Sequence, residues 1–449
     1  MKRPLTAVNR FADTSTKRIR AKSICCAVQQ TAVRIGHGEC FAVGLPSRLV
    51  PLQPSAGHAV PTRRELSGRR VILVNRPDAL PARPYFSSGP CAKPPGWSPD
   101  KLETVALGRS HRGSVGKVRL QEAIERTHAL LQLPPDYRLG IVPASDTGAM
   151  EMAIWSLLGT RPVTMLAWES FGAGWVTDVA KQLKLDADLR TADYGEICDL
   201  GSIGPASDIV FTWNGTTSGV RVPDADWIRA DRTGLSICDA TSAAFAQRID
   251  WDKVDVGTFS WQKALGGEAA HGMLVLSPRA VERLESEPAP RPLPKIFRLT
   301  KGGKLIDGIF KGETINTPSM LAVEDWLFCL DWAERIGGLD ALVARANANA
   351  AALDRWVQSA DWIEHLAAEP AIRSNTSVCL QFADRSDEET NRARQKAIGQ
   401  LLEREGAAFD ITAYRDAPPG LRIWCGATVE TADIEALGPW LDWAWEQTA

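Results

Sequence analysis

The chain has 449 residues, more than one hydrophobic core usually organises, which favours two folded domains and excludes a small disulfide-stapled module. Its 44% hydrophobic and 24% charged residues are typical of globular proteins and exclude a chain that is disordered throughout. The net charge of −2 conceals an asymmetry, because residues 1–78 contain 14 Lys and Arg against 4 Asp and Glu, whereas residues 79–449 contain 38 against 50. An acidic body offers no broad basic face, so we expect no nucleic-acid partner unless the basic N-terminal part supplies one.

The nine cysteines show no CxxC or Cys/His ligand spacing, which favours reduced thiols and predicts no metal site. No apolar run approaches the roughly 18 residues that a membrane span needs, so we expect no membrane partner. Residues 1–78 predict a basic, mostly disordered extension, since they sustain neither helical nor strand periodicity. Their Arg-rich, acid-poor composition also fits an organellar transit peptide, and the alternative is an extension without function. We expect a cytoplasmic protein, with organellar targeting as the alternative.

From Tyr85 onward short apolar runs alternate with helical patterns, which is typical of an α/β domain with a mainly parallel sheet. We assign residues 79–325 to this large domain. The expected strands are Leu139–Val142, Val163–Trp168, Asp208–Thr212, Leu235–Cys238, Val256–Ser260 and Met273–Leu276. Helical patterns between them include Gly148–Leu158 and Gly174–Leu183.

Residues 326–449 predict a small C-terminal α/β domain together with its linking helix. A helical stretch runs from Pro318 to Trp356, with a break expected at Gly337 and Gly338. The elements expected after it are the strand Ser377–Phe382, the helix Glu388–Glu405, the strands Ala407–Ile411 and Leu421–Trp424, and the helix Ala432–Glu446.

Two of the expected strands each deliver one ionisable residue near their carboxyl end. Asp239 follows Leu235–Cys238, and Lys263 follows Val256–Ser260, 24 residues after Asp239. Because ligands of open α/β sheets sit at the carboxyl ends of strands, we expect the two side chains to meet over one crevice. Pyridoxal phosphate chemistry needs a lysine that forms a Schiff base and a carboxylate that keeps the pyridine nitrogen protonated. Taken alone, such a pair is more often two unrelated solvated residues than a cofactor site.

A phosphate site is also needed, and the chain has no GxGxxG or Walker-type loop. Instead, the strand before Ala144 leads through Ser145, Asp146, Thr147 and Gly148 into a helix. Backbone N–H groups at a helix N-terminus bind anions, so this turn predicts a phosphate cradle. The alternative is a simple N-terminal cap.

Six motifs follow one another along the chain: Phe86-Ser-Ser-Gly-Pro90, Ser110-His-Arg-Gly113, Asn214-Gly-Thr-Thr-Ser-Gly219, Asp239, Ser260-Trp-Gln-Lys263 and Ile315-Asn-Thr-Pro318. In order and spacing they resemble the motifs of phosphoserine aminotransferases, which are class V aminotransferases of pyridoxal phosphate fold-type I. The resemblance covers residues 83–449. It implies a large cofactor-binding domain with a mainly parallel mixed sheet and a small C-terminal α/β domain.

The resemblance also implies roles for individual residues in binding pyridoxal 5'-phosphate. Lys263 would be the Schiff-base lysine and Asp239 the partner of the pyridinium nitrogen. The other cofactor-binding positions that it implies are Asp146 and Thr147 in the phosphate loop, Phe171 against the ring, Thr216 at the phenolic oxygen, Gln262 at the phosphate, and Asn316 and Thr317 in a loop that crosses to the other subunit's cofactor. A homodimer with shared active sites follows from that loop.

The substrate-binding residues implied by the resemblance are His111, Arg112, Arg415 and Arg422. The planar fork of Arg112 suits a carboxylate, and Arg422 would bind a second one, although a surface ion pair is its alternative. Two departures from the family pattern concern the substrate's phosphate. Thr147 stands where some members have an arginine, and Tyr414-Arg415 replaces a His-Arg pair, one residue further from Arg422 than expected.

The function that the resemblance implies is transamination that interconverts phosphoserine and 2-oxoglutarate with 3-phosphohydroxypyruvate and glutamate. Its expected pathway is L-serine biosynthesis, with pyridoxine biosynthesis as an additional one. The alternatives are another class V member, such as an alanine–glyoxylate or serine–pyruvate aminotransferase, and a non-catalytic regulator that keeps the fold and uses a basic arm. The intact pair of Asp239 and Lys263 favours an enzyme.

Overall fold

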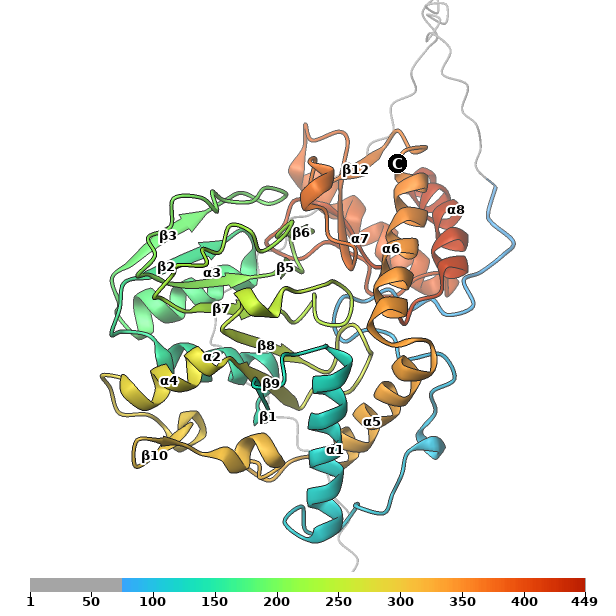
Figure 1. Cartoon of the computed structure of the whole chain (residues 1–449). Coiled ribbons are helices and arrows are strands. Elements are labelled where there is room, and N and C mark those ends of the chain that lie inside the picture. The colour runs from blue at the N-terminus through green and yellow to red at the C-terminus, as the bar shows by residue number, and fades with distance from the viewer. Residues whose placement is uncertain (1–74, 449) are drawn as a thin grey trace, which may run out of the picture. The chain divides into compact units, whose positions relative to one another are not determined.

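The computed structural model describes residues 75–448, which lie within one compact unit, Arg70–Ala449 (Figure 1). The extension expected over residues 1–78 lies, up to residue 74, outside the described residues. None of the helices in the described part is long and apolar enough to cross a membrane.

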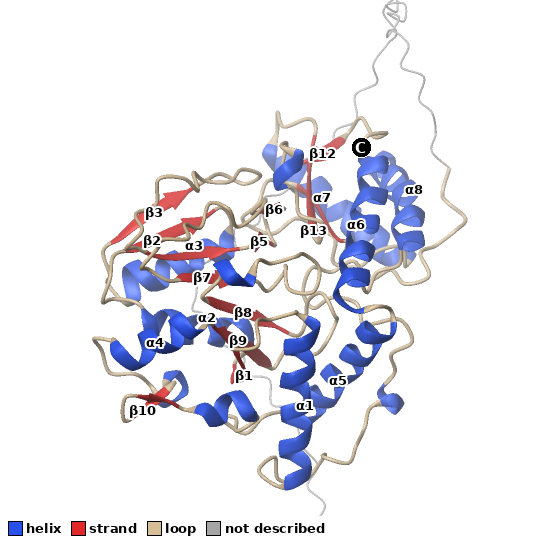
Figure 2. Ribbon diagram, in the orientation of Figure 1, coloured by secondary structure: helices blue, strands red, loops and turns tan. Residues whose placement is uncertain are grey.

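A seven-stranded mixed sheet forms the centre of the larger part, with the strand order β1-β9-β8-β7-β4-β2-β3 (Figure 2). The pairs β8–β7, β7–β4, β4–β2 and β2–β3 are parallel, whereas β9 runs antiparallel to β1 and β8. Its strands are β1 (Arg138–Pro143), β2 (Val163–Ala167), β3 (Ala187–Thr191), β4 (Asp208–Thr212), β7 (Ser236–Asp239), β8 (Val256–Ser260) and β9 (His271–Leu276). The predicted mainly parallel α/β sheet is therefore confirmed.

Helices cover both faces of this sheet, because its central strands are apolar on both sides. In β4, Val210 belongs to the core that contains Met150 of α2, and its neighbour Phe211 belongs to the core that contains Leu120 of α1. The helices are α1 (Ser114–Leu130), α2 (Ser145–Leu157), α3 (Ser170–Thr177), which continues as a π-helical turn over Asp178–Gln182, and α4 (Pro278–Ser286). Successive strand residues thus face different cores, as the pleat of a strand requires.

The C-terminal part is a second α/β layer. Its antiparallel sheet has the order β12-β13-β14, with β12 at Ile363–His365, β13 at Ser377–Phe382 and β14 at Gly420–Trp424. The helices here are α5 (Met320–Arg335), α6 (Gly338–Val357), α7 (Glu388–Glu405) and α8 (Thr431–Gln447). Gly337 has a φ of 115°, so the expected break between the first two helices lies at a residue that tolerates a left-handed backbone.

Several sequence-based boundaries differ from the structure. The strand expected at Ala407–Ile411 is wrong, since this segment makes only an isolated bridge between Phe409 and Tyr85, and Asp410 has a φ of 57° that no strand can include. The proposed domain boundary after residue 325 falls inside α5. The sequence analysis missed the strands β3 and β12. It also missed two short antiparallel pairs, β5 (Asn214–Gly215) with β6 (Val220–Arg221) and β10 (Thr300–Lys301) with β11 (Lys304–Leu305).

Candidate active site at the carboxyl ends of the central strands

Lys263 and Asp239 lie at the same edge of the sheet. Thr212 and Asp239 are register partners at the carboxyl ends of β4 and β7, Asp239 also pairs with Thr258 within β8, and Lys263 comes three residues after β8 ends. Both Lys263 and Asp239 are buried. The expectation that the two strands deliver these residues to one edge is met, because parallel strands bring their carboxyl ends together.

The Lys263 amine is held by the segment that contains Gly89. Its Nζ donates a hydrogen bond to the carbonyl oxygen of Ser88. A Cβ on Gly89, where φ is 153°, would lie 2.6 Å from Nζ, so only glycine leaves room for the amine. Nζ also lies 6.0 Å from the centre of the Trp424 ring.

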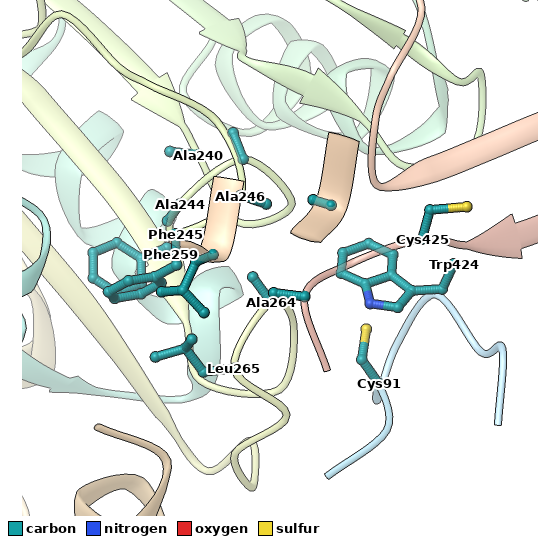
Figure 3. Packing of buried hydrophobic residues seen from close by; sticks show 14 of the residues in the cluster. Cys91, Ala240, Ala244, Phe245, Ala246, Phe259, Ala264, Leu265, Trp424 and Cys425 are labelled. Carbon is teal, nitrogen blue, oxygen red and sulfur yellow. The ribbon is translucent and has the colours of Figure 1, made fainter. Parts of the chain in front are cut away.

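Three segments that are far apart in the sequence close this side of the site. Ala264 and Leu265 follow Lys263, and Trp424 and Cys91 lie on the other side of Ala264 (Figure 3). Burial raises the pKa of the Cys91 thiol to about 12. Cys91 therefore packs as a neutral thiol and offers no nucleophile at neutral pH.

The pKa of the Lys263 ammonium is lowered, first by burial and then by the positive charge of Arg422, while the acidic residues Asp239 and Glu169 act in the opposite direction. A buried amine loses the hydration that stabilises its charged form. The lowered pKa increases the fraction of neutral amine, which is the form that attacks a carbonyl carbon and accepts a proton.

Asp239 is oriented by two donors. The indole Nε1 of Trp175 in α3 donates to Oδ2 at 3.1 Å, and the backbone N–H of Thr241 donates to Oδ1 at 3.0 Å. Two donors on different oxygens fix the plane of the carboxylate. Trp175 was missed from the sequence, because nothing in a helical tryptophan indicates that its N–H meets a strand-end carboxylate.

The N-terminal turn of α2 contains the segment that was predicted to form a phosphate loop. Ala144 adopts a left-handed conformation and no side chain caps the helix, so its first backbone N–H groups have no side-chain acceptor. Thr147 is exposed in this turn, whereas the Asp146 side chain is buried. A Cβ on Gly148 would lie 2.1 Å from the carbonyl oxygen of Pro143, so the turn depends on glycine.

Thr216 and Phe171 lie on the loops beside this edge. The Thr216 hydroxyl pairs with the hydroxyl of Ser242 in the residues described. The Phe171 side chain, in the first turn of α3, is 41% exposed, and its ring centre lies 6.0 Å from that of Tyr414. An exposed aromatic face of this kind suits stacking against a flat ring.

Glu169 is a second residue that sequence reasoning missed. It is buried directly before α3, where it accepts hydrogen bonds from the Gly172 N–H at 2.7 Å and the Thr217 hydroxyl at 2.8 Å. Burial raises its pKa to about 7. An acidic residue immediately before a helix was the available signal, since such residues cap helices.

The two expected substrate arginines of the C-terminal part have different surroundings. Arg422 in β14 is close enough to Lys263 to affect its pKa, and its Nε is buried without a hydrogen-bond partner. Arg415 has an 80% exposed side chain that pairs with Asp416 at 3.4 Å. Both guanidinium groups approach the Tyr414 ring, at 5.6 Å and 5.5 Å from its centre. Arg422 therefore lies near Lys263, and Arg415 lies at an exposed position beside Tyr414.

The remaining expected residues gather in a second place. His111 and Arg112 line a cavity of about 550 Å³ together with Thr314 and Ile315, and Lys263 and Asp239 are absent from its lining. The Thr314 hydroxyl donates to the carbonyl oxygen of Asn316 at 2.7 Å, and Asn316 donates to that of Thr317 at 3.2 Å. The cavity also has lysine and arginine side chains, from Lys117, Lys295, Arg298 and Lys301. One chain thus has two separate groups of expected site residues.

The buried polar atoms that lack a hydrogen-bond partner around Lys263 and Asp239 fit the polar groups of pyridoxal phosphate. Within residues 75–448, buried polar atoms without a hydrogen-bond partner include Asp146 Oδ1, Thr241 Oγ1, Gln262 Oε1 and Arg422 Nε. Such atoms are rare in folded proteins unless water or a ligand supplies the partner. A ligand with a protonated ring nitrogen, a phenolic oxygen and a phosphate offers the needed donors and acceptors beside the Lys263 amine, whose pKa is lowered.

Comparison with known proteins gave the following matches. The chain is 57% identical over 371 residues to a phosphoserine aminotransferase from Methanosarcina barkeri, covering 82% of this chain and 99% of that protein. Among solved structures, a pyridoxal phosphate-bound phosphoserine aminotransferase from Trichomonas vaginalis superposes with a TM-score of 0.64 at 18% identity, covering 80% of this chain and 99% of that one. An alanine–glyoxylate aminotransferase from Nostoc sp. reaches 0.67 at 17% identity, covering 82% and 97%. No protein-family model matches the chain.

Proposed function

Because the chain belongs to the phosphoserine aminotransferase family, we propose that it interconverts phosphoserine with 2-oxoglutarate and 3-phosphohydroxypyruvate with glutamate, as a pyridoxal phosphate-dependent transaminase. Serine biosynthesis is the expected role. The observation that carries the proposal is the 57% identity over nearly the whole length of the Methanosarcina barkeri relative. The buried pair of Lys263 and Asp239 at one sheet edge supports it.

When bound, pyridoxal phosphate supplies an aldehyde that takes up the amino group and a ring that accepts the electron pair left at the substrate's alpha carbon. Lys263 Nζ would hold that aldehyde covalently until the substrate's amine displaces it, and the freed amine would then accept the proton from the alpha carbon. Its burial favours the neutral amine that both steps require. Asp239, aligned by Trp175 and Thr241, would hold a proton on the ring nitrogen.

The other assignments concern binding. The uncapped first turn of α2 would hold the phosphate through backbone N–H groups around Thr147, with Gln262 beside it. Phe171 would pack against the ring, and Thr216 would turn its hydroxyl from Ser242 to the phenolic oxygen. Arg422, whose Nε has no partner, would bind a substrate carboxylate.

The proposal includes a homodimer with shared active sites. His111 and Arg112 lie with the Asn316 and Thr317 loop around a cavity that neither Lys263 nor Asp239 lines. These residues would serve the crevice of the partner subunit, where the basic side chains would meet the cofactor phosphate and the substrate phosphate.

A substrate comparison tests the function. With 2-oxoglutarate as acceptor, phosphoserine should exceed serine and alanine as amino donor by at least about 100-fold in kcat/KM, because a site built for phosphate leaves its cations unpaired when the donor has no phosphate. A preference for alanine or serine would instead support an alanine–glyoxylate or serine–pyruvate aminotransferase, whose fold the Nostoc structure shares. Absence of turnover with every donor, in protein that binds no pyridoxal phosphate, would support the non-catalytic regulator.

A further inference from the structure

Asp146 lies in the predicted phosphate loop, but its side chain faces Asp239 instead of the place proposed for the phosphate. It lies in the first turn of α2 and is buried. Its carboxyl group faces the carboxyl group of Asp239 and the hydroxyls of Thr258 and Thr241. The backbone of its turn belongs to the predicted phosphate loop, and its side chain belongs to the ring-nitrogen end of the site.

The packing of α2 against the sheet places it there. A Cβ on Gly272 in β9 would lie 2.1 Å from the carbonyl oxygen of Ser145, so the start of α2 presses directly on this edge. One helical turn after Asp146, the Met150 sulfur accepts a hydrogen bond from Thr258 Oγ1 at 3.6 Å. Residues 146 and 150 share a helix face, and Thr258 is the register partner of Asp239. Figure 1 shows α2 beside the strands β8 and β9.

The surroundings of Asp146 contain no opposite charge. The groups that act on the Asp146 carboxyl group include no positive charge, and among residues 75–448 its Oδ1 has no hydrogen-bond partner. Burial, reinforced by the negative charge of Asp239, raises its pKa well above the usual range, although the two hydroxyls act in the opposite direction. Two carboxyl groups this close cannot both remain ionised at low cost.

We propose that Asp146 is a protonated positioning residue, which donates a hydrogen bond to the Asp239 carboxylate and so completes the set of donors that aim it at the cofactor's ring nitrogen. Trp175 Nε1 and the Thr241 N–H are the other two donors. The pair then carries one negative charge opposite one positively charged ring. A neutral Asp146 also leaves the positive N-terminal end of α2 free to bind the cofactor's phosphate. An ionised Asp146 would itself interact with that end of the helix dipole and would repel the negatively charged phosphate.

The consequence for catalysis rests on the cofactor proposed above, but the protonation state can be measured without turnover. A group whose pKa is raised in the folded state contributes stability that is complete below its unfolded pKa and is lost as the pH rises through the folded pKa. Asp146→Asn keeps a neutral donor that does not titrate. The difference in Tm between this variant and the wild type should therefore grow by about 3 °C or more from pH 5 to pH 8, in the full chain with and without pyridoxal phosphate.

Other groups near the pair are common to both proteins. Glu169 and Lys263 lie close to Asp239, and they titrate in the variant as in the wild type, so the difference isolates Asp146. Asp340→Asn is the matched control, since it removes an exposed acidic residue from the first turn of α6. A Tm difference for Asp146→Asn that stays constant across this range, as expected for the control, would overturn the proposal.

A binding titration gives the second measurement. The dissociation constant of pyridoxal phosphate should change by less than about threefold in Asp146→Asn and rise about tenfold in Asp146→Ala, which has no donor. An equal loss of affinity in both variants would mean that the ionised carboxylate is needed. Unchanged affinity in Asp146→Ala would mean that Asp146 does not position Asp239. Either result overturns the proposal. If Asp146→Asn does not fold, Asp146→Ser takes its place, because a hydroxyl also donates and serine is favoured at helix starts. Phosphoserine specificity enters neither measurement, so failure here is distinct from failure of the proposed function.

Discussion

Lys263 is the residue on which the proposed chemistry depends most. Lys263→Ala should abolish transamination, because no other amine lies at the carboxyl end of β8 in the described part to attack the aldehyde and move the proton. The protein should still fold and retain loosely bound cofactor. Turnover is the measurement, with Lys311→Ala, an exposed lysine, as the control that keeps wild-type activity. Turnover of Lys263→Ala within about tenfold of the wild type would remove it from this role.

Asp239 should be second in importance. Asp239→Asn should lower kcat by at least about 100-fold, because an amide does not hold a proton on the ring nitrogen as a carboxylate does. Trp175→Phe, which keeps an aromatic ring but loses the N–H at 3.1 Å from Oδ2, should lower kcat by about tenfold. Normal turnover of Asp239→Asn with full cofactor occupancy would contradict the assignment.

The two arginines beside Tyr414 should behave differently. Arg422→Ala should lower kcat/KM about 10- to 150-fold for both glutamate and phosphoserine, because it removes a charge-assisted donor, worth roughly 1.5–3 kcal/mol, from a carboxylate that both share. Arg415→Ala should affect the phosphorylated substrate more than glutamate. Its side chain is 80% exposed and paired with Asp416, so the effect should be smaller than that of Arg422. Equal losses for both substrates in Arg415→Ala would place it at the shared carboxylate.

At the scale of elements, α3 connects several parts of the site. Its first turn carries Phe171, its second carries Trp175, and Glu169 before it accepts hydrogen bonds from Gly172 within the helix and from Thr217 in the neighbouring loop. A single buried carboxyl group therefore fixes the start of the helix that positions both aromatic residues.

The raised pKa of Glu169 predicts a pH-dependent stability of this element. Since burial raises it to about 7, the contribution of Glu169 is complete below its unfolded pKa, near 4.5, and is lost as the pH rises through about 7. Glu169→Gln should remove this dependence. The gain in unfolding free energy of the variant relative to the wild type should increase between pH 5 and pH 8 by up to about 3 kcal/mol in denaturant titrations. A difference independent of pH would show that Glu169 is ionised throughout.

At the scale of the whole molecule, the expected site residues form two separate groups, one around Lys263 and Asp239 and one around His111 and Arg112. The cavity lined by His111 and Arg112 is lined by neither Lys263 nor Asp239. In the proposed homodimer, the segment with His111 and Arg112 of one subunit would complete the site around Lys263 of the other subunit.

Mixing two inactive variants tests the shared site. Lys263→Ala lacks the amine, and Arg112→Ala lacks the proposed phosphate ligand of the partner's site. If the site is shared, a refolded equal mixture should regain about one quarter of wild-type activity, because each mixed dimer has one complete site. Activity no greater than the sum of the two separate variants would place Arg112 and Lys263 in the same subunit's site.

Periodicity and spacing predicted those parts of the fold that depend on local pattern. The strand β4 and the helix α7 have the expected bounds, Asp208–Thr212 and Glu388–Glu405, because an apolar run and a helical period suffice to identify them. The segment Ala407–Ile411 was misjudged, because its β-branched and apolar residues resemble a strand, whereas a left-handed Asp410 decides its course.

The sequence by itself determined the α/β class, the meeting of Asp239 and Lys263 at one sheet edge, and the family through collinear motifs. These follow from the order of strands and from residue identity, which are local or linear properties. Only the tertiary structure decided that Trp175 aligns Asp239, that Glu169 is buried under α3, and that the Asp146 side chain faces Asp239. Such contacts join segments separated by tens of residues, and whether a carboxyl group is charged there depends on burial and neighbours that the linear sequence does not contain.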